Sequence, residues 1–220
     1  MGDLSGTMLE QAETALFREQ IAESIRATMW IGDATREDEL EKFSSFTGII
    51  KKILDDSTAS DSEIKKIELS AEPSETNIES TLKQLWANAS DLLKSLKSEG
   101  NLAFFMTSDA YAAYEESLDA AEYETAYVAR QNGRKELMYK GIPLVDIKVD
   151  DYIELVGDLP TTFILLTDRR NIALAVNTND FPGTEVKMWY NPDEMENRQR
   201  AVFMATCDYL LPELVSIAYM

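Results

Sequence analysis

The sequence predicts a mixed α+β fold, and three of its features support that class. An apolar stripe at helical spacing covers residues 8–31, a second one covers residues 76–100, and short apolar segments beside turn residues fill residues 133–176. The 220 residues are enough for one substantial core or for two small lobes.

The first helix is expected over residues 8–31. Its apolar positions recur at helical spacing and are Leu9, Ala12, Leu16, Phe17, Ile21, Ile25 and Met29. A helix of this length is a rod of about 35 Å, and Gly32 is expected to end it. A rod that long has to lie across another part of the molecule, although an amphipathic helix of any α+β domain explains the stripe equally well.

The segment after this helix is polar up to Ser45, and a short apolar segment follows at residues 46–50. Residues 54–73 are expected to form an acidic loop that is interrupted by a strand over residues 64–69. Asp55, Asp56 and Asp61 lack the central glycine and the final glutamate of an EF-hand calcium loop, so they are interpreted as solvated carboxylates.

The middle of the chain predicts helix, strand and helix in that order. The first of these helices is expected to begin at Thr76 or Asn77, whose side chains can cap its first turn, and to end at Gly100. Residues 102–106 are expected to form a buried strand. Thr107 or Ser108 is then expected to cap a helix that extends to about residue 118.

Strands are expected to dominate beyond residue 133. Gly141 and Pro143 punctuate a first short apolar strand within residues 133–147, Pro160 opens a second within residues 158–176, and residues 168–171 form a polar turn. Further strands are expected at residues 152–156, 184–190 and 213–218, with a turn at residues 191–193. Residues 195–211 fit either a helix or a long strand, and Pro212 separates them from the last strand.

The composition excludes several classes of function. The chain has no histidine, which removes the usual general base and the Ser-His and Cys-His nucleophile pairs. Its single cysteine, Cys207, lies in an apolar stretch and is interpreted as a buried, inert thiol. The formal net charge of −19 argues against a surface that binds nucleic-acid phosphates. No membrane span and no secretory signal are expected.

No residue is assigned a catalytic, cofactor-binding or metal-binding role, and no cofactor is expected. Acidic pairs such as Asp150-Asp151 and Glu115-Glu116 are neighbours in sequence, so their carboxylates do not converge on one substrate atom. The chain also lacks a glycine-rich phosphate loop, a nucleophile elbow and a metalloprotease helix. An enzyme is therefore not expected.

Two motifs resemble a known family. Residues 137–145 follow the pattern Leu-x-Tyr-Lys-Gly-Ile-Pro-Leu-Val, and residues 159–172 follow Leu-Pro-x-x-x-Ile-Leu-Leu-Thr-Asp-x-x-Asn-Ile. Together they resemble the C-terminal part of tailed-phage major capsid proteins of the HK97-like shell fold. The pair Gly32-Asp33 and the segment Thr47-Gly48-Ile49-Ile50 resemble shorter features of the same family. The resemblance extends over residues 8–218 and is strong only over residues 102–176.

The resemblance implies an α+β subunit of two lobes. A peripheral lobe over residues 1–101 would carry residues 8–31 as its long spine helix, an axial lobe would be inserted over residues 102–205, and residues 206–220 would return to the peripheral lobe. The family also carries an N-terminal arm and an extended loop before the spine helix. Both are absent here, so the chain is expected to be truncated or naturally short, and to be a monomer or small oligomer on its own.

The function implied is that of a structural subunit of a phage or prophage capsid, which self-assembles around packaged DNA. The implied partners are other copies in hexamers and pentamers, with scaffold and portal proteins as further candidates, in the host bacterial cytoplasm and then in the virion. Like charge between the acidic wall and DNA would keep the genome from sticking. No lysine-asparagine pair for a covalent link between subunits is identified.

Two alternatives to a phage capsid stay open. The first alternative is an encapsulin-type nanocompartment shell, and the second is an acidic protein-interaction module unrelated to capsids.

The basic pair Arg169 and Arg170 also has two interpretations. The pair is either part of a turn that Asp168 and Asn171 stabilise locally, or it supplies cations that pair with carboxylates of a neighbouring subunit.

Overall fold

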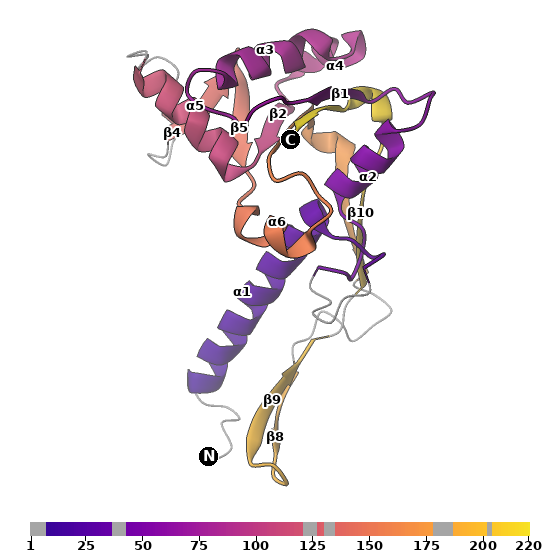
Figure 1. The fold of residues 1–220 in the computed structure, drawn as a ribbon. Coiled ribbons are helices and arrows are strands. Elements are labelled where there is room, and N and C mark those ends of the chain that lie inside the picture. Colours follow the sequence, from indigo (N-terminus) through magenta and orange to yellow (C-terminus); the bar gives the residue numbers. More distant parts are fainter. Residues whose placement is uncertain (1–7, 37–42, 121–126, 130–134, 178–186, 202–203) are drawn as a thin grey trace.

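The computed structural model describes residues 8–36, 43–120, 127–129, 135–177, 187–201 and 204–220 (Figure 1). A body built around a seven-stranded sheet occupies one end of the molecule, and a long helix and a β-hairpin extend from it (Figure 1). The fold is mixed α+β, as the sequence predicts.

The strands of the large sheet are paired in the order β1-β11-β6-β2-β5-β4-β3. Their bounds are β1 Lys65–Glu68, β2 Leu102–Met106, β3 Tyr127–Ala129, β4 Lys135–Tyr139, β5 Ile142–Asp146, β6 Phe163–Asp168 and β11 Ser216–Tyr219. The pairs β1–β11 and β2–β5 are parallel, and the remaining pairs are antiparallel. The last strand of the chain therefore lies between β1 and β6, so residues distant in sequence hold the sheet together.

The core consists of one apolar cluster on each face of this sheet. Side chains alternate between the two faces along a strand, so Phe104 of β2 joins one cluster while Phe105 packs against the other. Residues of β6 divide in the same way, with Leu166 in the first cluster and Leu165 in the second. This explains why β2 and residues 163–166 of β6 are continuously apolar rather than alternating.

Helices cover both faces. The first cluster takes residues from α3 (Ile78–Asn88), α4 (Asp91–Ser95) and α5 (Ser108–Ala120), and the second takes residues from the end of α1 (Met8–Ile31), α2 (Ile49–Ser57) and α6 (Asp150–Val156). Two smaller sheets complete the fold: β7 (Ile172–Asn177) pairs with β10 (Met204–Tyr209), and β8 (Lys187–Asn191) pairs with β9 (Glu196–Arg200).

Most of the expected long elements are confirmed. Helix α1 has the expected bounds, β2 and α5 lie where the middle of the chain predicts them, and β1 is the strand expected in the acidic loop. The polar turn after β6 is the short helix Arg169–Asn171. Residues 133–134 and 184–186 of the expected strands lie outside the described residues. The proposed lobe boundaries at residues 101 and 206 stay a prediction.

The helix expected over residues 76–100 is wrong as a single element. The chain leaves the helix at Ala89 and re-enters it as α4, followed by a short 3-10 helix over Leu96–Glu99. Ser90 causes the break, since its hydroxyl accepts the amide of Leu93 at 3.1 Å and donates to the carbonyl of Glu213 at 2.7 Å. Asn77 does not cap α3 with its side chain, which instead bonds the backbone of Glu72 and Ser74.

Two other expectations differ from the structure, and one alternative that the sequence left open is decided. Residues 152–156 belong to helix α6 and not to a strand, because Ile153 and Val156, three residues apart, are the positions that it buries. The acidic loop begins later than expected, because residues 49–57 form α2 around the buried Ile49, Ile50 and Ile53. Where residues 195–211 are described, they form strands β9 and β10 and not a helix.

Candidate assembly surface

The N-terminal part of α1 projects from the body (Figure 1). No residue before Ala27 in the described part of α1 is buried, although the expected apolar stripe is present. We call Leu9, Leu16, Phe17, Ile21 and Ile25 the α1 stripe; Leu9 is 52% exposed and Leu16 is 62% exposed. Isolated helices gain little stability in water without a packed face. The α1 stripe is therefore a candidate surface for packing against another element.

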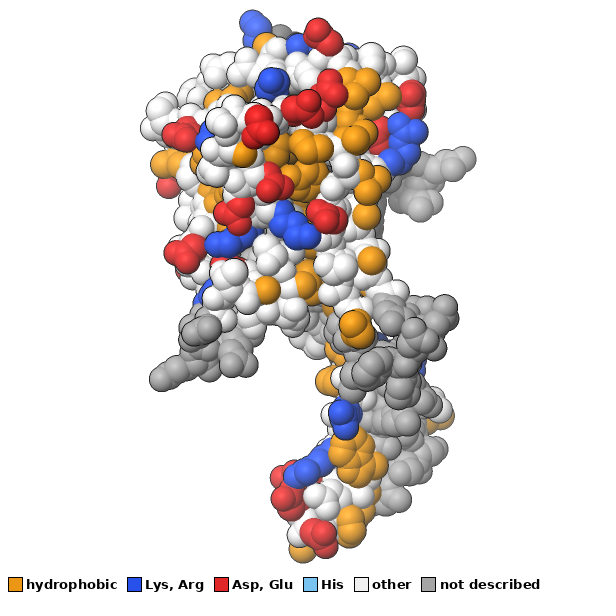
Figure 2. All heavy atoms as spheres, turned by 90° about the vertical axis from the view of Figure 1, so that its right-hand side faces the viewer, with side chains coloured by type: hydrophobic (Ala, Val, Ile, Leu, Met, Phe, Trp, Pro, Cys, Tyr) orange, Lys and Arg blue, Asp and Glu red, His pale blue; other side chains and the backbone are white. Residues whose placement is uncertain are grey.

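The β8–β9 hairpin is the second projecting element (Figures 1 and 2). Its two strands form a sheet of their own, and a lone two-stranded hairpin is only marginally stable in water. The side chain of Trp189 is 43% exposed and that of Met195 is 66% exposed. Leu174, Val176 and Met204 add exposed apolar side chains on the neighbouring β7–β10 pair. Exposed apolar surface of this kind marks sites of protein association.

The last turn of α1 anchors the helix firmly in the body. Trp30 is buried and its ring lies 5.1 Å from that of Phe105, while Ile31 is fully buried in the second cluster. The thiol of Cys207 donates to the carbonyl of Met29 at 3.4 Å. Cys207 is buried, as expected, and this burial raises the pKa of its thiol to about 11; the residue lies in strand β10.

The two short family-like motifs meet at this anchor. The amide of Gly48, which precedes α2, donates to the carbonyl of Gly32, which follows α1, at 2.7 Å. A Cβ atom on Gly48 would lie 2.6 Å from the Gly32 nitrogen and 2.7 Å from the Trp30 carbonyl oxygen. The two glycines therefore allow the ends of α1 and α2 to approach at backbone distance.

Asp33 is a buried carboxylate beside the same glycine pair. It accepts the amide and hydroxyl of Thr35 at 2.9 and 2.6 Å, and Lys51 lies 3.0 Å from its other oxygen. Burial alone would raise the pKa of Asp33, but the hydrogen bonds from Thr35 and Lys51 outweigh it and leave the pKa below its ordinary value. The charged form of Asp33 thus fixes the chain as it leaves α1.

Helix α6 braces α1 one turn before the buried anchor. The hydroxyl of Tyr152 donates to Glu23 at 2.7 Å, and the guanidinium of Arg26 reaches the carbonyl of Lys148 at 3.5 Å. The hydrogen bond to Glu23 raises the pKa of Tyr152, because it favours the protonated phenol. These contacts set the direction in which α1 leaves the body.

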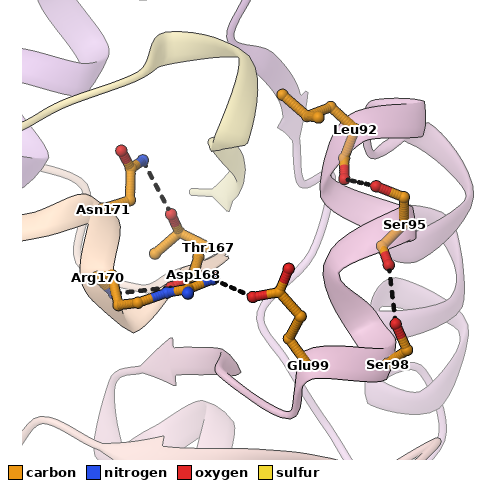
Figure 3. A network of polar contacts seen from close by, with 8 residues as sticks. All are labelled: Leu92, Ser95, Ser98, Glu99, Thr167, Asp168, Arg170 and Asn171. Atoms are coloured by element: carbon orange, nitrogen blue, oxygen red, sulfur yellow. Dashed lines mark hydrogen bonds and ion pairs between the residues drawn. The ribbon is translucent and has the colours of Figure 1, made fainter.

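In the basic turn after β6, Arg170 pairs with acidic residues of its own chain (Figure 3). Arg170 lies 2.7 Å from Asp168 and 2.6 Å from Glu99, so its guanidinium pairs within the chain. Asp168 bonds the local backbone as expected, whereas Asn171 bonds the distant Leu210 and Leu211. Pairing of the exposed Arg169 with a neighbouring subunit stays a prediction.

The acidic pair Asp150-Asp151 lines a pocket of about 320 Å³ together with Ser108, Asp146 and Lys148. Asp150 accepts the amide of Ser108 at 2.9 Å, so its carboxylate, and not the expected Thr107 or Ser108 side chain, satisfies the first turn of α5. The hydroxyl of Ser108 donates to Asp146 at 2.8 Å. These groups satisfy one another, which is typical of a structural cap.

In the described ranges, no group of three or more histidine, cysteine or acidic side chains is arranged to hold a metal ion. None of the helices among those residues is long and apolar enough to cross a membrane.

No protein-family model matches the sequence, and no curated protein sequence matches it. Solved structures do match. The holo-SrpI encapsulin complex from Synechococcus elongatus PCC 7942 contains a chain with a TM-score of 0.57 and 14% identity, and the match covers 98% of this chain and 66% of that one. A chain of the satellite phage P4 procapsid that includes the size determination (Sid) protein has a TM-score of 0.54 and 10% identity, over 97% of this chain and 64% of that one.

These likenesses concern the fold, because the identities are low. The chain spans less than two thirds of the length of either neighbour. One neighbour belongs to an encapsulin complex and the other to a phage procapsid. The chain therefore shares a mixed α+β fold with a chain of an encapsulin complex and with a chain of a phage procapsid.

Proposed function

We propose that this chain is a structural subunit that associates with other copies of itself into a closed icosahedral shell. The fold that it shares with an encapsulin and a phage procapsid chain supports this role. The observation that carries the proposal is the α1 stripe, which places five apolar side chains on a helix that has no buried position before Ala27 among its described residues.

The energetics favour covering this stripe by association. Full burial of one leucine, isoleucine or phenylalanine side chain is worth about 1.5–3 kcal/mol. The same covering stabilises the helix itself. In a shell, repeated modest contacts add up because each subunit makes them with several neighbours.

We further propose a phage or prophage capsid that packages DNA, with scaffold and portal proteins as additional partners and the virion as its location. The motifs over residues 137–145 and 159–172 favour this assignment. An encapsulin-type compartment is the second candidate, because the encapsulin chain matches at a TM-score similar to that of the procapsid chain. The contents of the particle separate the two, since a capsid encloses DNA and a compartment encloses protein cargo.

The direct test is to isolate particles from cells that carry the gene, with and without prophage induction. Sedimentation separates particles from free protein, mass spectrometry identifies this chain in each fraction, and electron microscopy shows whether the particles are closed. We expect the chain in the fast-sedimenting fraction as a major shell component. Recovery of the chain only as free protein under both conditions would overturn the proposal.

A substitution in α1 tests the surface itself. Leu16→Asp in the gene is expected to remove the chain from the particle fraction, because it places a charge in the middle of the α1 stripe. Ala15→Asp is the matched control: it adds the same charge to the same helix at another exposed position, about 100° around the helix from Leu16, and no member of the α1 stripe lies three or four residues from it. Equal losses for both variants would show that the stripe is not the contact surface.

A further inference from the structure

Strand β1 forms an edge of the seven-stranded sheet (Figure 1). Among the described strands it pairs only with β11, in parallel. Lys65, Lys66 and Glu68 are exposed on it, and Ile67 is partly buried against the first core cluster. An exposed edge of this kind is a template for pairing with another strand.

The hydrogen bonds to β11 show which backbone groups face the open side. The amide of Lys65 donates to the carbonyl of Val215 at 3.2 Å, and the amide of Leu69 donates to that of Tyr219 at 2.8 Å. In a parallel ladder, alternate residues direct both of their backbone groups to the same neighbour. The N–H and C=O groups of Lys66 and Glu68 therefore point away from β11.

We propose that β1 pairs with β1 of a second copy, in antiparallel orientation, about a two-fold axis at Ile67. In this register Lys66 of each copy lies opposite Glu68 of the other, and both residues offer outward backbone groups. The two residues can exchange both N–H···O bonds, as a hydrogen-bonded antiparallel pair requires. The two-fold axis repeats the Lys66–Glu68 pair, so the dimer contains it twice.

Charge favours this register of the two β1 strands over the two adjacent registers. The adjacent registers that oppose outward-facing residues place Lys66 against Lys66 or Glu68 against Glu68, and like charges directly opposite each other are destabilising. A lysine on an edge strand commonly discourages pairing. Here lysine and glutamate lie two residues apart on one face, so they discourage pairing in general and permit it in a single self-complementary arrangement.

The opposite face of β1 supports the same register. Ile67 lies on the axis, so the two Ile67 side chains face each other as a non-hydrogen-bonded pair, in which side chains approach more closely.

On the face that carries Lys66, Glu68 has an oxygen to spare. Glu68 already accepts a hydrogen bond from the hydroxyl of Tyr219 at 3.0 Å through one oxygen. Its second oxygen remains available to accept Lys66 of the second copy.

This contact goes beyond the proposed function, since it uses a different surface from the α1 stripe and needs only two copies. It is short, with a four-residue strand on each side. Interfaces of this size are weak, so we expect a monomer–dimer equilibrium at high protein concentration rather than a permanent dimer.

Charge reversal tests the register. Sedimentation equilibrium is measured for the wild type, Lys66→Glu, Glu68→Lys and the double variant Lys66→Glu/Glu68→Lys. Each single variant creates two like-charge pairs and is expected to raise the dimer dissociation constant about tenfold. The double variant recreates two opposite-charge pairs and is expected to return to the wild-type value. Lys65→Glu, whose side chain lies on the other face, is the matched control and is expected to leave dimerisation unchanged.

Thermal unfolding of each variant separates loss of pairing from loss of fold, which matters most for Glu68→Lys because it also removes the Tyr219 hydrogen bond. A wild type that stays monomeric at every accessible concentration would overturn the proposal, and an acidic peptide of another protein would then be the candidate for the basic edge. A double variant as weak as the single ones would overturn it too. Particle recovery from cells is an independent readout, so failure of this contact and failure of the shell proposal are distinguishable.

Discussion

The carboxylate of Asp168 is only 1% exposed and accepts three hydrogen bonds from Arg170, one from the amide and two from the guanidinium. These bonds close the turn between β6 and β7 and hold Asn171 in place. The side chain of Asn171 in turn accepts the amide of Leu211 at 2.8 Å, where the chain returns to the sheet. One buried carboxylate thus links the turn to the final strand.

Replacement of Asp168 tests this role. The hydrogen bonds from Arg170 hold the pKa of Asp168 below its ordinary value of 3.8, so the carboxylate stays charged in the folded chain to a lower pH than in the unfolded chain. Its stabilising contribution is therefore complete above the unfolded pKa and is lost as pH falls through the folded pKa. Asp168→Asn is expected to lower the free energy of unfolding by about 2 kcal/mol at neutral pH.

The measurement is urea unfolding of Asp168→Asn and of the wild type at several pH values. The difference between them is expected to shrink as the pH falls from about 5 to about 2. Glu99→Gln is the control, because it removes the exposed partner of the same arginine and is expected to cost less than about 1 kcal/mol. A difference that does not change with pH would mean that the ion pair is not the source of the effect.

Among the elements, those with a long local pattern were the ones that the sequence could predict. Helix α1 repeats its apolar positions over six turns, and the apolar run of β2 shows that the strand is buried on both faces. The residues of the α1 stripe could therefore be named in advance. Their exposure could not, because it depends on which other elements reach them.

The elements that were missed depend on distant contacts or are too short for their period to show. The break before α4 requires the carbonyl of Glu213, more than a hundred residues away. Helix α6 has seven residues, and over that length helical and strand patterns are hard to separate. The β1 edge could be located only after the sheet order was known, since it becomes an edge because β11 returns beside it.

The junction of α1 and α2 gives a prediction at the scale of these elements. Gly48→Ala is expected to lower the free energy of unfolding by about 2–3 kcal/mol, because the added methyl group meets backbone atoms that cannot move aside easily. Gly100→Ala is the comparison: Gly100 has a φ of +76° but open space around it, so only conformational strain of about 1 kcal/mol is expected. Urea unfolding measures both. Equal costs would show that the junction has room for a side chain.

For the whole molecule, the dominant property is its charge of −19, from 40 acidic against 21 basic residues. A shell wall of this charge repels the phosphates of enclosed DNA, and DNA binding without sequence preference requires lysine and arginine to displace counterions. We expect no binding of duplex DNA to the purified chain, even at about 0.05 M salt, where electrostatic binding is strongest.

Fluorescence anisotropy of labelled duplex DNA is the measurement, with a cationic peptide as the positive control. Binding that weakens steeply with added salt would reveal a local basic surface and contradict the prediction. The result also bears on the two candidate shells. A wall that does not bind DNA is compatible with a capsid only if a motor and portal drive the genome inside, whereas a compartment needs only affinity for its protein cargo. The absence of binding therefore makes the particle contents, and not the charge of the wall, the observation that decides between them.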